Sequence, residues 1–382
     1  MNFNYKLFAI IFNIFNFFPI KKDEISFIIE GNSFDGNLKY IKKELDTRGY
    51  FKYNFIYKDK FSFNNIKSFK FFFEMIFFLL EFFIIKTYKL AKSKYIFLND
   101  NFFPMAYMNF SEDTLVIQLW HAPGAFKKFG FEILDDNNIK NLFKLIGPKI
   151  DYLFVSSNNL SKIYQKAFCV DENKILALGT PRIDYYFNKN NNNSENIMKI
   201  KNKFEKAYPE IKGKKIVLYA PTFRTNKELN DNISNHFNGN LFQRELGDKY
   251  CLFFKSHPKF NISKIDNSID VSEYENLQEL LLISDILITD YSSVMIEYSI
   301  LSKPIIFYPF DLDYYSNNER GFYFDYNNVP GPIAKNTKDI INIIQNNHFD
   351  MGKIDSFSNK NHEYLDDKSS KRIIDYLFGK DN

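Results

Sequence analysis

The chain has 382 residues, enough for two domains of ordinary size. Its 50 Lys and Arg against 46 Asp and Glu leave a net charge of +4, which argues against a protein that holds nucleic acid through overall charge. Two cysteines, Cys169 and Cys251, exclude a disulfide framework and favour a reducing compartment.

Two apolar stretches lie near the N-terminus. Leu7–Ile20 is apolar except for two Asn, but it is shorter than the ~20 residues that span a bilayer, and no small-residue cleavage site follows it. Phe69–Ile85 is rich in Phe, and Lys67, Glu74 and Glu81 recur every seven residues to give a helix one polar stripe. For both stretches, burial in the core and contact with a membrane surface remain open, and neither is expected to be a transmembrane helix.

Strands alternate with helices through the first half of the chain. Short apolar runs predict strands at Ile25–Ile29, Phe51–Tyr57, Tyr95–Leu98, Leu115–Leu119, Tyr152–Val155 and Ile175–Leu178. Helices are expected over Leu38–Leu45 and Ser157–Phe168. This alternation is typical of βαβ units and a parallel sheet.

An Asn-rich run, Asn188–Asn196, interrupts the pattern and predicts a linker. After it, strands are expected at Ile216–Tyr219, Leu252–Phe254, Ile269–Val271, Ile286–Thr289 and Ile305–Tyr308. We therefore expect an α/β protein of two doubly wound domains, residues 1–190 and 191–382, facing a cleft. The last helix, about Ser369–Phe378, could pack on either half.

A first polar cluster follows the strand that ends at Leu119. Trp120–Gly124 (WHAPG) places His121 on a stiff loop, and Lys127 and Lys128 follow. Open α/β sheets bind ligands at the carboxyl ends of their strands, so this imidazole can face a site. A structural histidine is the competing interpretation.

Two further clusters follow strands of the second half. Ala220–Arg224 (APTFR) offers the Thr222 hydroxyl and a guanidinium to an anion, although a surface arginine on a turn would look the same. Lys255–Pro258 (KSHP) repeats the design of the first cluster, with His257 beside a proline.

The fourth cluster, Asp290–Ser293 (DYSS), leads into a helix expected over Val294–Ser299. Backbone N–H groups at such a turn can bind an anion, but Ser and Asp also cap helices everywhere. Four clusters at strand ends in both halves together predict a cleft that handles phosphate.

Several sharper motifs are missing. Gly31–Gly36 has the glycine spacing of a P-loop, but Asn37 and Leu38 stand where Lys and Ser or Thr are required. The sequence has no GxGxxG after a strand, no HExxH, no CxxC and no GxSxG. Asp311 and Asp313 are a weak candidate for a metal site, and no metal is predicted.

The blocks resemble those of a known family. Trp120–Gly130 (WHAPGAFKKFG) resembles the His-Gly-Thr-Pro block and basic pair of the CDP-glycerol glycerophosphotransferase family, which builds teichoic acids and related capsule polymers. Its other blocks, in the family's order, are similar to Ser33–Tyr40, Tyr219–Arg224, Lys255–Pro258, Asp285–Glu297 and Lys303-Pro304. The resemblance covers Ile25–Phe310. One departure is that Ala122 and Pro123 replace Gly and Thr, which removes a hydroxyl beside His121.

The resemblance implies a GT-B architecture of two Rossmann-like domains, with the CDP-linked donor bound mainly by the C-terminal one and the acceptor on the N-terminal side. The implied reaction transfers a polyol phosphate, with glycerol phosphate as the first expectation, to a hydroxyl of a lipid-linked or polymer acceptor and releases CMP. A peripheral position at the cytoplasmic face of the cell membrane follows, with the apolar helices as contact surface. No cofactor is implied, and a need for a divalent cation stays open.

Roles for individual residues come with the resemblance. His121 would be the general base on the acceptor hydroxyl, because an imidazole can accept a proton at neutral pH, and His257 would be the second catalytic histidine. The residues implied in donor binding are Thr222, Arg224, Lys255, Asp290, Ser292, Ser293 and Glu297. Lys127 and Lys128 would serve the acceptor side.

Other functions remain open. A CDP-ribitol donor shares the nucleotide half with CDP-glycerol, so these clusters do not separate the two. A GT-B glycosyltransferase would share the fold but release a nucleoside diphosphate. A non-catalytic module that binds membrane or polysaccharide would keep both histidines for structure alone.

Overall fold

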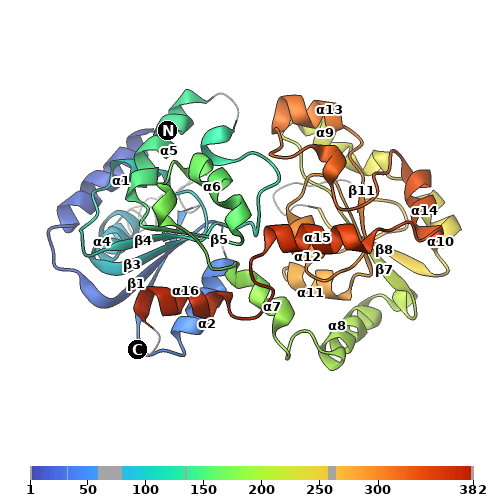
Figure 1. Ribbon diagram of the computed structural model, residues 1–382, viewed down its shortest axis with the longest axis horizontal. Helices are drawn as coiled ribbons and strands as arrows, with labels where there is room; N and C mark the ends of the chain where they lie inside the picture. Colours follow the sequence, from blue (N-terminus) through green and yellow to red (C-terminus); the bar gives the residue numbers. More distant parts are fainter. Residues whose placement is uncertain (1, 32, 59–79, 134–135, 257–263, 380–382) are drawn as a thin grey trace, which may run out of the picture. The chain divides into compact units, whose positions relative to one another are not determined.

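The computed structural model describes residues 2–31, 33–58, 80–133, 136–256 and 264–379. The chain forms two compact units (Figure 1). The first consists of Met1–Ala122, Phe129–Asp184 and Lys368–Asn382, and the second of Pro123–Lys128 and Tyr185–Asp367.

The first unit is built on a parallel sheet. Within the described residues its strand order is β2-β1-β3-β4-β5-β6. The strands are β1 (Lys21–Ile29), β2 (Lys52–Tyr57), β3 (Ser93–Leu98), β4 (Leu115–Gln118), β5 (Tyr152–Val155) and β6 (Ile175–Ala177). Helices cover both faces, so strand residues such as Phe27 and Ile117 are fully buried, as expected for near-continuous apolar strands.

Two helices that are far apart in the sequence, α2 and α16, lie together on one face of this sheet. The helices of the first unit are α1 (Asn2–Phe15), α2 (Asn37–Leu45), α4 (Thr87–Lys92), α5 (Asn137–Ile146), α6 (Ser161–Phe168) and α16 (Ser369–Phe378). α2 and α16 are side by side (Figure 1), and Ile41 and Ile373 join the core with Ile25 of β1. The C-terminal helix therefore packs on the first sheet and helps to cover one of its faces.

The N-terminal apolar stretch forms α1, which has two different faces. Phe8 and Phe12 are buried, and the Phe8 ring lies 5.3 Å from Phe82 in a π-helical turn, Glu81–Lys86. On the other face Ile10 and Ile14 are each 58% exposed. One face of α1 is therefore packed against the unit, and the opposite face is exposed. The Phe-rich stretch that was expected over 69–85 is described only from residue 80 onward, and the rest of it lies outside the described residues.

The second unit repeats the plan. Within the described residues its parallel sheet has the order β11-β10-β7-β8-β9. The strands are β7 (Lys215–Ala220), β8 (Tyr250–Phe254), β9 (Ile269–Asp270), β10 (Ile286–Thr289) and β11 (Ile305–Phe307). All the strands that the apolar runs predicted in both halves are confirmed, and so is the α/β class.

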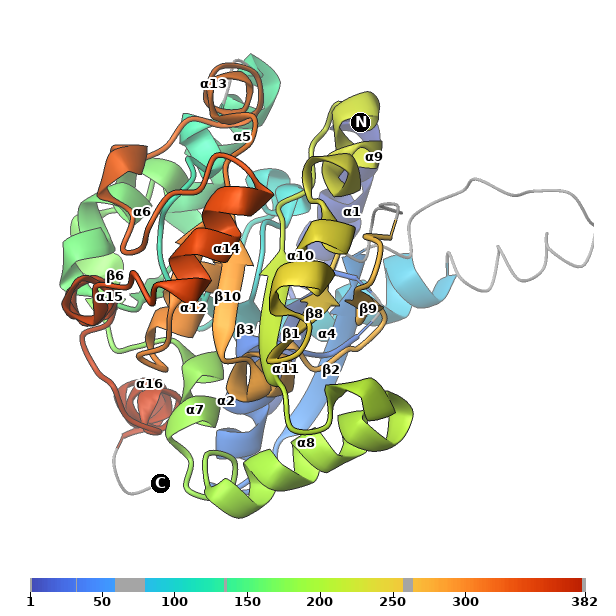
Figure 2. The same cartoon turned by 90° about the vertical axis from the view of Figure 1, so that its right-hand side faces the viewer.

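Helices flank this sheet as well. They are α8 (Ser194–Ala207), α9 (Lys227–Asp231), α10 (Gly239–Leu246), α11 (Leu277–Ile283), α12 (Val294–Ser299), α13 (Leu312–Tyr314), α14 (Thr337–Gln345) and α15 (Met351–Asn361). α10 and α14 lie together over one face (Figure 2), where Phe242 and Ile340 pack with Val217 of β7. α8 packs on α11, and α12 packs on α15.

The units differ from the expected division at residue 190 in three ways. The chain changes unit after Asp184, the last helix belongs to the first unit, and a short segment at 123–128 belongs to the second. The C-terminal exchange has a polar cause: the buried Asp184 carboxylate accepts hydrogen bonds from the backbone N–H groups of Ser369 and Ser370, both 2.9 Å. These bonds cap the start of α16.

The Asn-rich run, which was predicted to be a linker, has a defined structure. It is an ordered turn between α7 (Asp184–Phe187) and α8. Asn192 Nδ2 donates to the Tyr186 carbonyl at 2.7 Å, and the Asn193 side chain accepts from the backbone N–H of Asn196 at the start of α8. Asn side chains satisfy backbone groups locally, so a run of them can order a turn.

Candidate active site

Buried contacts hold the backbone of the loop after β4. Trp120 has a positive φ of 57°, which is uncommon for a large side chain, and its ring stacks on Phe129 at 5.1 Å. The Asn37 side chain donates to the Trp120 carbonyl at 2.6 Å. The next residue, His121, is therefore held by a buried backbone while its own side chain stays half exposed.

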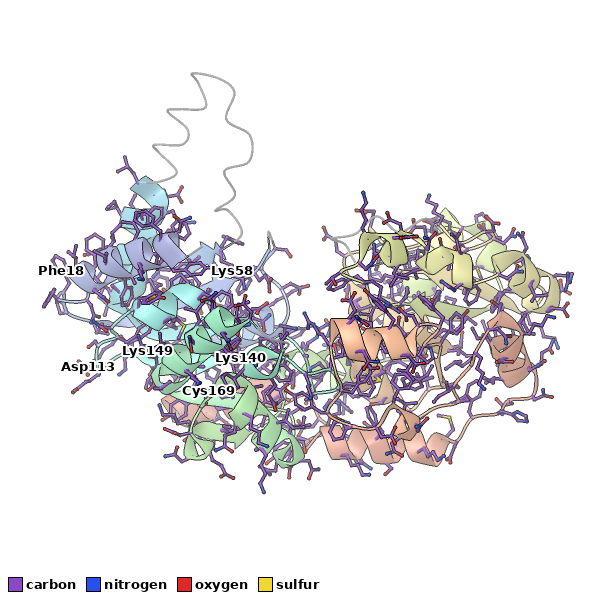
Figure 3. The ribbon with its side chains drawn as sticks, turned by 90° about the horizontal axis from the view of Figure 1, so that it is seen from above. Phe18, Lys58, Asp113, Lys140, Lys149 and Cys169 are labelled. Atoms are coloured by element: carbon purple, nitrogen blue, oxygen red, sulfur yellow. The ribbon has the colours of Figure 1, made fainter. Side chains whose placement is uncertain are left out.

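A carboxylate accompanies the His121 imidazole. Asp100 follows β3, the neighbour of β4 in the sheet, and its Oδ2 lies 3.7 Å from His121 Nδ1. Lys58 Nζ lies 3.7 Å from the same oxygen; Figure 3 labels Lys58. Asp100 is not among the residues predicted from the sequence. It lies two residues after a predicted strand, but only the structure shows that this strand is the neighbour of the one before His121.

The second unit gathers three residues that the sequence assigned to donor binding. Thr222 follows β7 and Asp290 follows β10, and the Thr222 backbone N–H donates to Asp290 Oδ1 at 2.8 Å. Arg224 Nη2 donates to Asp290 Oδ2 at 3.0 Å, and its Nη1 donates to the Thr222 carbonyl. Among the described residues, the buried Thr222 hydroxyl has no hydrogen-bond partner.

Arg224 has a second carboxylate partner, which sequence analysis had kept as a weak metal candidate. Its Nε and Nη2 each donate to Asp311 at 2.7 Å, and the guanidinium lies about 5 Å from the rings of Tyr291 and Tyr315. Burial opposes the charge, but the carboxylates of Asp290 and Asp311 outweigh it and raise the pKa of Arg224. The guanidinium is thus fully buried and paired.

The Asp311 carboxylate is correspondingly committed to Arg224 and to the Tyr291 hydroxyl, which donates to it at 3.0 Å. Within the described residues, no three His, Cys, Asp or Glu side chains group closely enough to hold a metal ion.

The Lys255 side chain binds the loop that follows β9. Its Nζ donates to the carbonyls of Ser272 at 3.1 Å and Tyr274 at 2.8 Å, and burial lowers its pKa. The Ser256 hydroxyl donates to Ser272 Oγ at 2.9 Å. This lysine therefore ties the end of β8 to the segment after β9. His257, the next candidate, lies outside the described residues.

The remaining donor-side candidates lie at α12. Ser292 and Ser293 are half-buried, and Ser292 Oγ accepts from the Val294 N–H at 3.3 Å. Glu297 is buried and accepts a 2.7 Å hydrogen bond from the Tyr186 hydroxyl. The two serines thus keep accessible surface, whereas the Glu297 side chain is turned into the unit.

Lys127 and Lys128, expected on the acceptor side, both belong to the second unit. The Lys128 N–H donates to the Gly321 carbonyl at 2.8 Å, and Lys127 pairs with Phe322 in an isolated antiparallel bridge. This placement corrects the expectation that put both lysines in the N-terminal domain.

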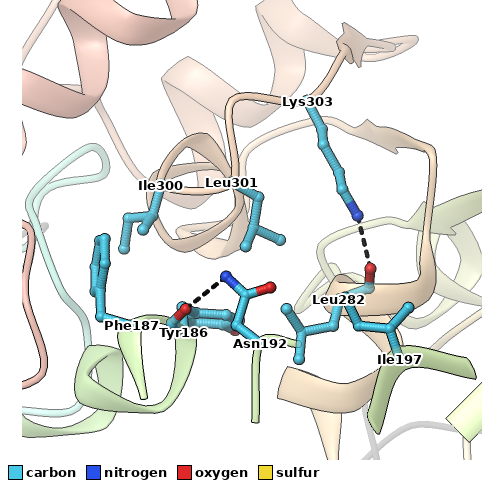
Figure 4. A pocket seen from close by; sticks show the side chains of 8 residues that line it. All are labelled: Tyr186, Phe187, Asn192, Ile197, Leu282, Ile300, Leu301 and Lys303. Carbon is cyan, nitrogen blue, oxygen red and sulfur yellow. Dashed lines mark hydrogen bonds between the residues drawn. The ribbon is translucent and has the colours of Figure 1, made fainter. Parts of the chain in front are cut away.

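A cavity of about 160 Å³ lies in the second unit near the N-terminal ends of β10 and β11, whereas the polar cluster follows their C-terminal ends (Figure 4). Leu282, Ile300 and Leu301 line it, and Lys303 at its rim donates to the Leu282 and Ser284 carbonyls at 2.6 and 2.8 Å. Lys303, which belongs to one of the blocks that carry the family resemblance, therefore links the end of α11 to the start of β11. It is not part of the polar cluster.

The model of the family described as CDP-Glycerol:Poly(glycerophosphate) glycerophosphotransferase matches residues 10–379. The chain belongs to this family. The family resemblance read from the sequence blocks is thereby confirmed.

Relatives of this glycerophosphotransferase-family chain carry names for both polyols. The teichoic acid poly(ribitol-phosphate) polymerase of Bacillus spizizenii is 34% identical over 98% of this chain. The match takes in only 59% of that polymerase, so the chain spans less than two thirds of its length. The teichoic acid glycerol-phosphate primase of Bacillus subtilis is 34% identical over 90% of each chain.

Solved structures of the wall teichoic acid polymerase TagF have the same fold. One variant of TagF is 25% identical, with a TM-score of 0.76 over 98% of this chain and 94% of that one. A structure of TagF after a soak with CDPG has a TM-score of 0.76 at 26% identity. The expected GT-B type of two Rossmann-like domains is confirmed. A UDP-GlcNAc 2-epimerase from Neisseria meningitidis, 13% identical with a TM-score of 0.55, shares the fold alone.

Proposed function

We propose that this family member transfers a polyol phosphate, glycerol phosphate first, from a CDP-linked donor to a hydroxyl group of a lipid-linked or polymer acceptor. The acceptor oxygen forms a bond to the phosphorus that carries the polyol, the bond from that phosphorus to the bridging oxygen breaks, and CMP leaves. Family membership and the named relatives support this reaction. Ribitol phosphate is the alternative, since ribitol-phosphate relatives match at the same identity.

The observation that carries the proposal is the pair of His121 and Asp100. In this scheme His121 takes the proton of the acceptor hydroxyl as the oxygen attacks, and the Asp100 carboxylate, 3.7 Å from Nδ1, stabilises the imidazolium that forms. The half-exposed imidazole beside the anchored Trp120 backbone suits this role, because a base must reach its substrate without reorganising.

On the donor side, catalysis of phosphoryl transfer rests on positioning and charge. The Thr222 hydroxyl, which lacks a partner among the described residues, and the Ser292 and Ser293 hydroxyls are proposed to bind phosphate oxygens. Arg224 and Asp290 are proposed to position the Thr222 loop, because their charged groups are already paired. From the sequence we retain His257, Lys255 and Glu297 as further donor-side candidates.

We also propose a peripheral position at the cytoplasmic face of the cell membrane. Among the described residues, no helix combines the length and apolar character that crossing a bilayer requires. The outward face of α1 supports surface contact instead: Phe3, Ile10 and Ile14 are each more than half exposed. Phe18, which follows α1 and is labelled in Figure 3, is 47% exposed. Such a face suits a bilayer interface.

The test of the proposed function is nucleotide release. Purified protein is offered CDP-glycerol and CDP-ribitol separately, with a membrane extract as the source of acceptor, and CMP is measured with and without EDTA. We expect CMP from one donor, which names the polyol. His121→Ala should abolish release yet still bind the donor, because the base acts on the acceptor.

Two results would contradict the proposal. Release of UDP or GDP from a sugar donor, with no CMP from either polyol donor, would make the chain a glycosyltransferase. Saturable binding without turnover of any donor would make it a non-catalytic module.

A further inference from the structure

The segment Pro123–Lys128 follows a strand of the first unit but is built into the second. The Tyr323 N–H donates to the Phe126 carbonyl at 2.9 Å, the Lys128 N–H donates to the Gly321 carbonyl, and Lys127 pairs with Phe322. The position of the Lys127 side chain is therefore set by the second unit, whose loops carry the donor-side cluster.

The Lys127 ammonium has no counterion in the described part of the chain. Its Nζ lies 5.9 Å from the centre of the Tyr315 ring, and no hydrogen-bond acceptor or carboxylate of the described residues bonds to it. Burial, and after it the charge of Arg320, lower the pKa of Lys127 to about 7. The two cations are thus close enough to repel each other.

Arg320 is in the same situation. It is half-buried, and its guanidinium makes no ion pair or side-chain hydrogen bond with any described residue. The adjacent Glu319 carboxylate is committed elsewhere, since it accepts from the Thr225 N–H at 2.9 Å and the Thr225 hydroxyl at 2.7 Å.

The Asp290 and Asp311 carboxylates of the donor-side cluster are also already paired with other groups. Asp290 and Asp311 both bind Arg224, and the Tyr291 hydroxyl takes a further position on Asp311. Two half-buried cations that repel each other, neither paired with a carboxylate of the described residues, are unfavourable unless an anion joins them, because burial and like charge both oppose the charged forms.

We propose that Lys127 and Arg320 together bind a phosphate group of the CDP-linked donor. The inference rests on the proposed function and deepens it. Phosphate groups occur in the donor and along a polyol-phosphate polymer, so either could supply the anion. We assign the site to the donor because both cations, and the Thr222 and Asp290 loops beside them, belong to the second unit.

The test is equilibrium binding of CDP-glycerol and CDP-ribitol to the full chain, measured without acceptor. Lys127→Met and Arg320→Met should each raise the Kd of the donor by about 10-fold to 100-fold, as expected for one charge-assisted contact. Lys203→Met is the matched control, because Lys203 also lies over a tyrosine ring, 4.8 Å from the centre of Tyr274, and should leave the Kd unchanged.

A pH series separates a charge contact from a merely structural one. The donor diphosphate does not titrate between pH 7 and 9, whereas Lys127 loses its proton in that range, so the wild-type Kd should rise by about tenfold. Lys127→Arg keeps its charge and should show a flat profile. The charged groups around Lys127 are Arg320, Arg224, Asp290 and Glu319.

The outcomes are distinct. Wild-type affinity in Lys127→Met, or the same pH profile in wild type and Lys127→Arg, would overturn the inference. An unchanged donor Kd with a raised KM for the acceptor would show that the anion is the polymer's phosphate and overturn the assignment to the donor. Failure of the wild-type chain to bind either CDP-linked polyol would instead defeat the proposed function itself.

Discussion

The buried guanidinium of Arg224 orders three strand ends of the second sheet at once. It pairs with Asp290 after β10 and Asp311 after β11 while its own residue follows β7. Removing one partner of such a buried pair typically costs about 3–5 kcal/mol, because the other charge is left without compensation. We therefore attribute to Arg224 a positioning role for the Thr222 loop.

A second buried residue gives the molecule an acid-sensitive point. His362 follows α15, is 3% exposed, and has its Nε2 3.4 Å from the Ile296 carbonyl. Burial lowers its pKa from 6.5 to about 4. Between these values the unfolded chain binds a proton that the folded chain does not, so the free energy of unfolding falls as pH drops from about 6.5 to about 4.

We expect His362→Gln to flatten this fall by about 3 kcal/mol at most. The measurement is urea unfolding at a series of pH values. His348→Gln is the control, because His348 is exposed, and it should keep the wild-type slope. A His362→Gln slope equal to that of the wild type would refute the assignment.

At this scale the sequence located side chains but could not orient them. It placed Thr222, Arg224 and Asp290 together because all three follow parallel strands of one sheet, and the structure brings them into contact. It could not tell that Lys255 binds carbonyl oxygens, nor that Asp100 accompanies His121, because both depend on rotamers and on which strands are neighbours.

Among the described elements, α1 exposes a row of apolar side chains on its outward face. Its exposed apolar residues, Phe3, Leu7, Ile10 and Ile14, recur at spacings of four and three. Fourteen residues give a helix of about 21 Å, less than the ~30 Å hydrocarbon core, so the helix can lie on a bilayer but not cross it. The exposed Lys22 and Lys89 suit anionic headgroups.

Vesicle sedimentation tests this surface. We expect the double variant Ile10→Asn and Ile14→Asn to lose most of its binding to anionic vesicles, because each side chain would give up about 1.5–3 kcal/mol of apolar burial. Met198→Asn is the matched control, since Met198 is 57% exposed on α8 of the other unit. Equal sedimentation of the double variant and the wild type would return α1 to a purely packing role.

Element types followed from the sequence more readily than their roles. Apolar runs of four to six residues between turns located the strands because parallel strands are buried on both faces. The Asn-rich run misled because composition does not show that Asn192 and Asn193 bind nearby backbone groups. The apolar helix was ambiguous because one sequence stretch supplies both a buried and an exposed face.

For the whole molecule, the sequence predicted two repeated α/β domains but not how the chain is shared between them. The segment at 123–128 lies within first-unit sequence but belongs to the second unit. The helix at 369–378 follows second-unit sequence but belongs to the first unit. These exchanges depend on contacts between residues far apart in the chain, such as Asp184 with Ser370, and local patterns do not encode them.

In the proposed reaction the phosphorus moves together with the polyol. To test this, a CDP-linked polyol labelled with ³²P only in the phosphate next to the polyol is incubated with the full chain and a membrane extract. We expect the label to enter the acceptor fraction while the released CMP carries none. Label retained in a released nucleoside diphosphate would show cleavage on the polyol side of that phosphate and would refute the proposed transfer.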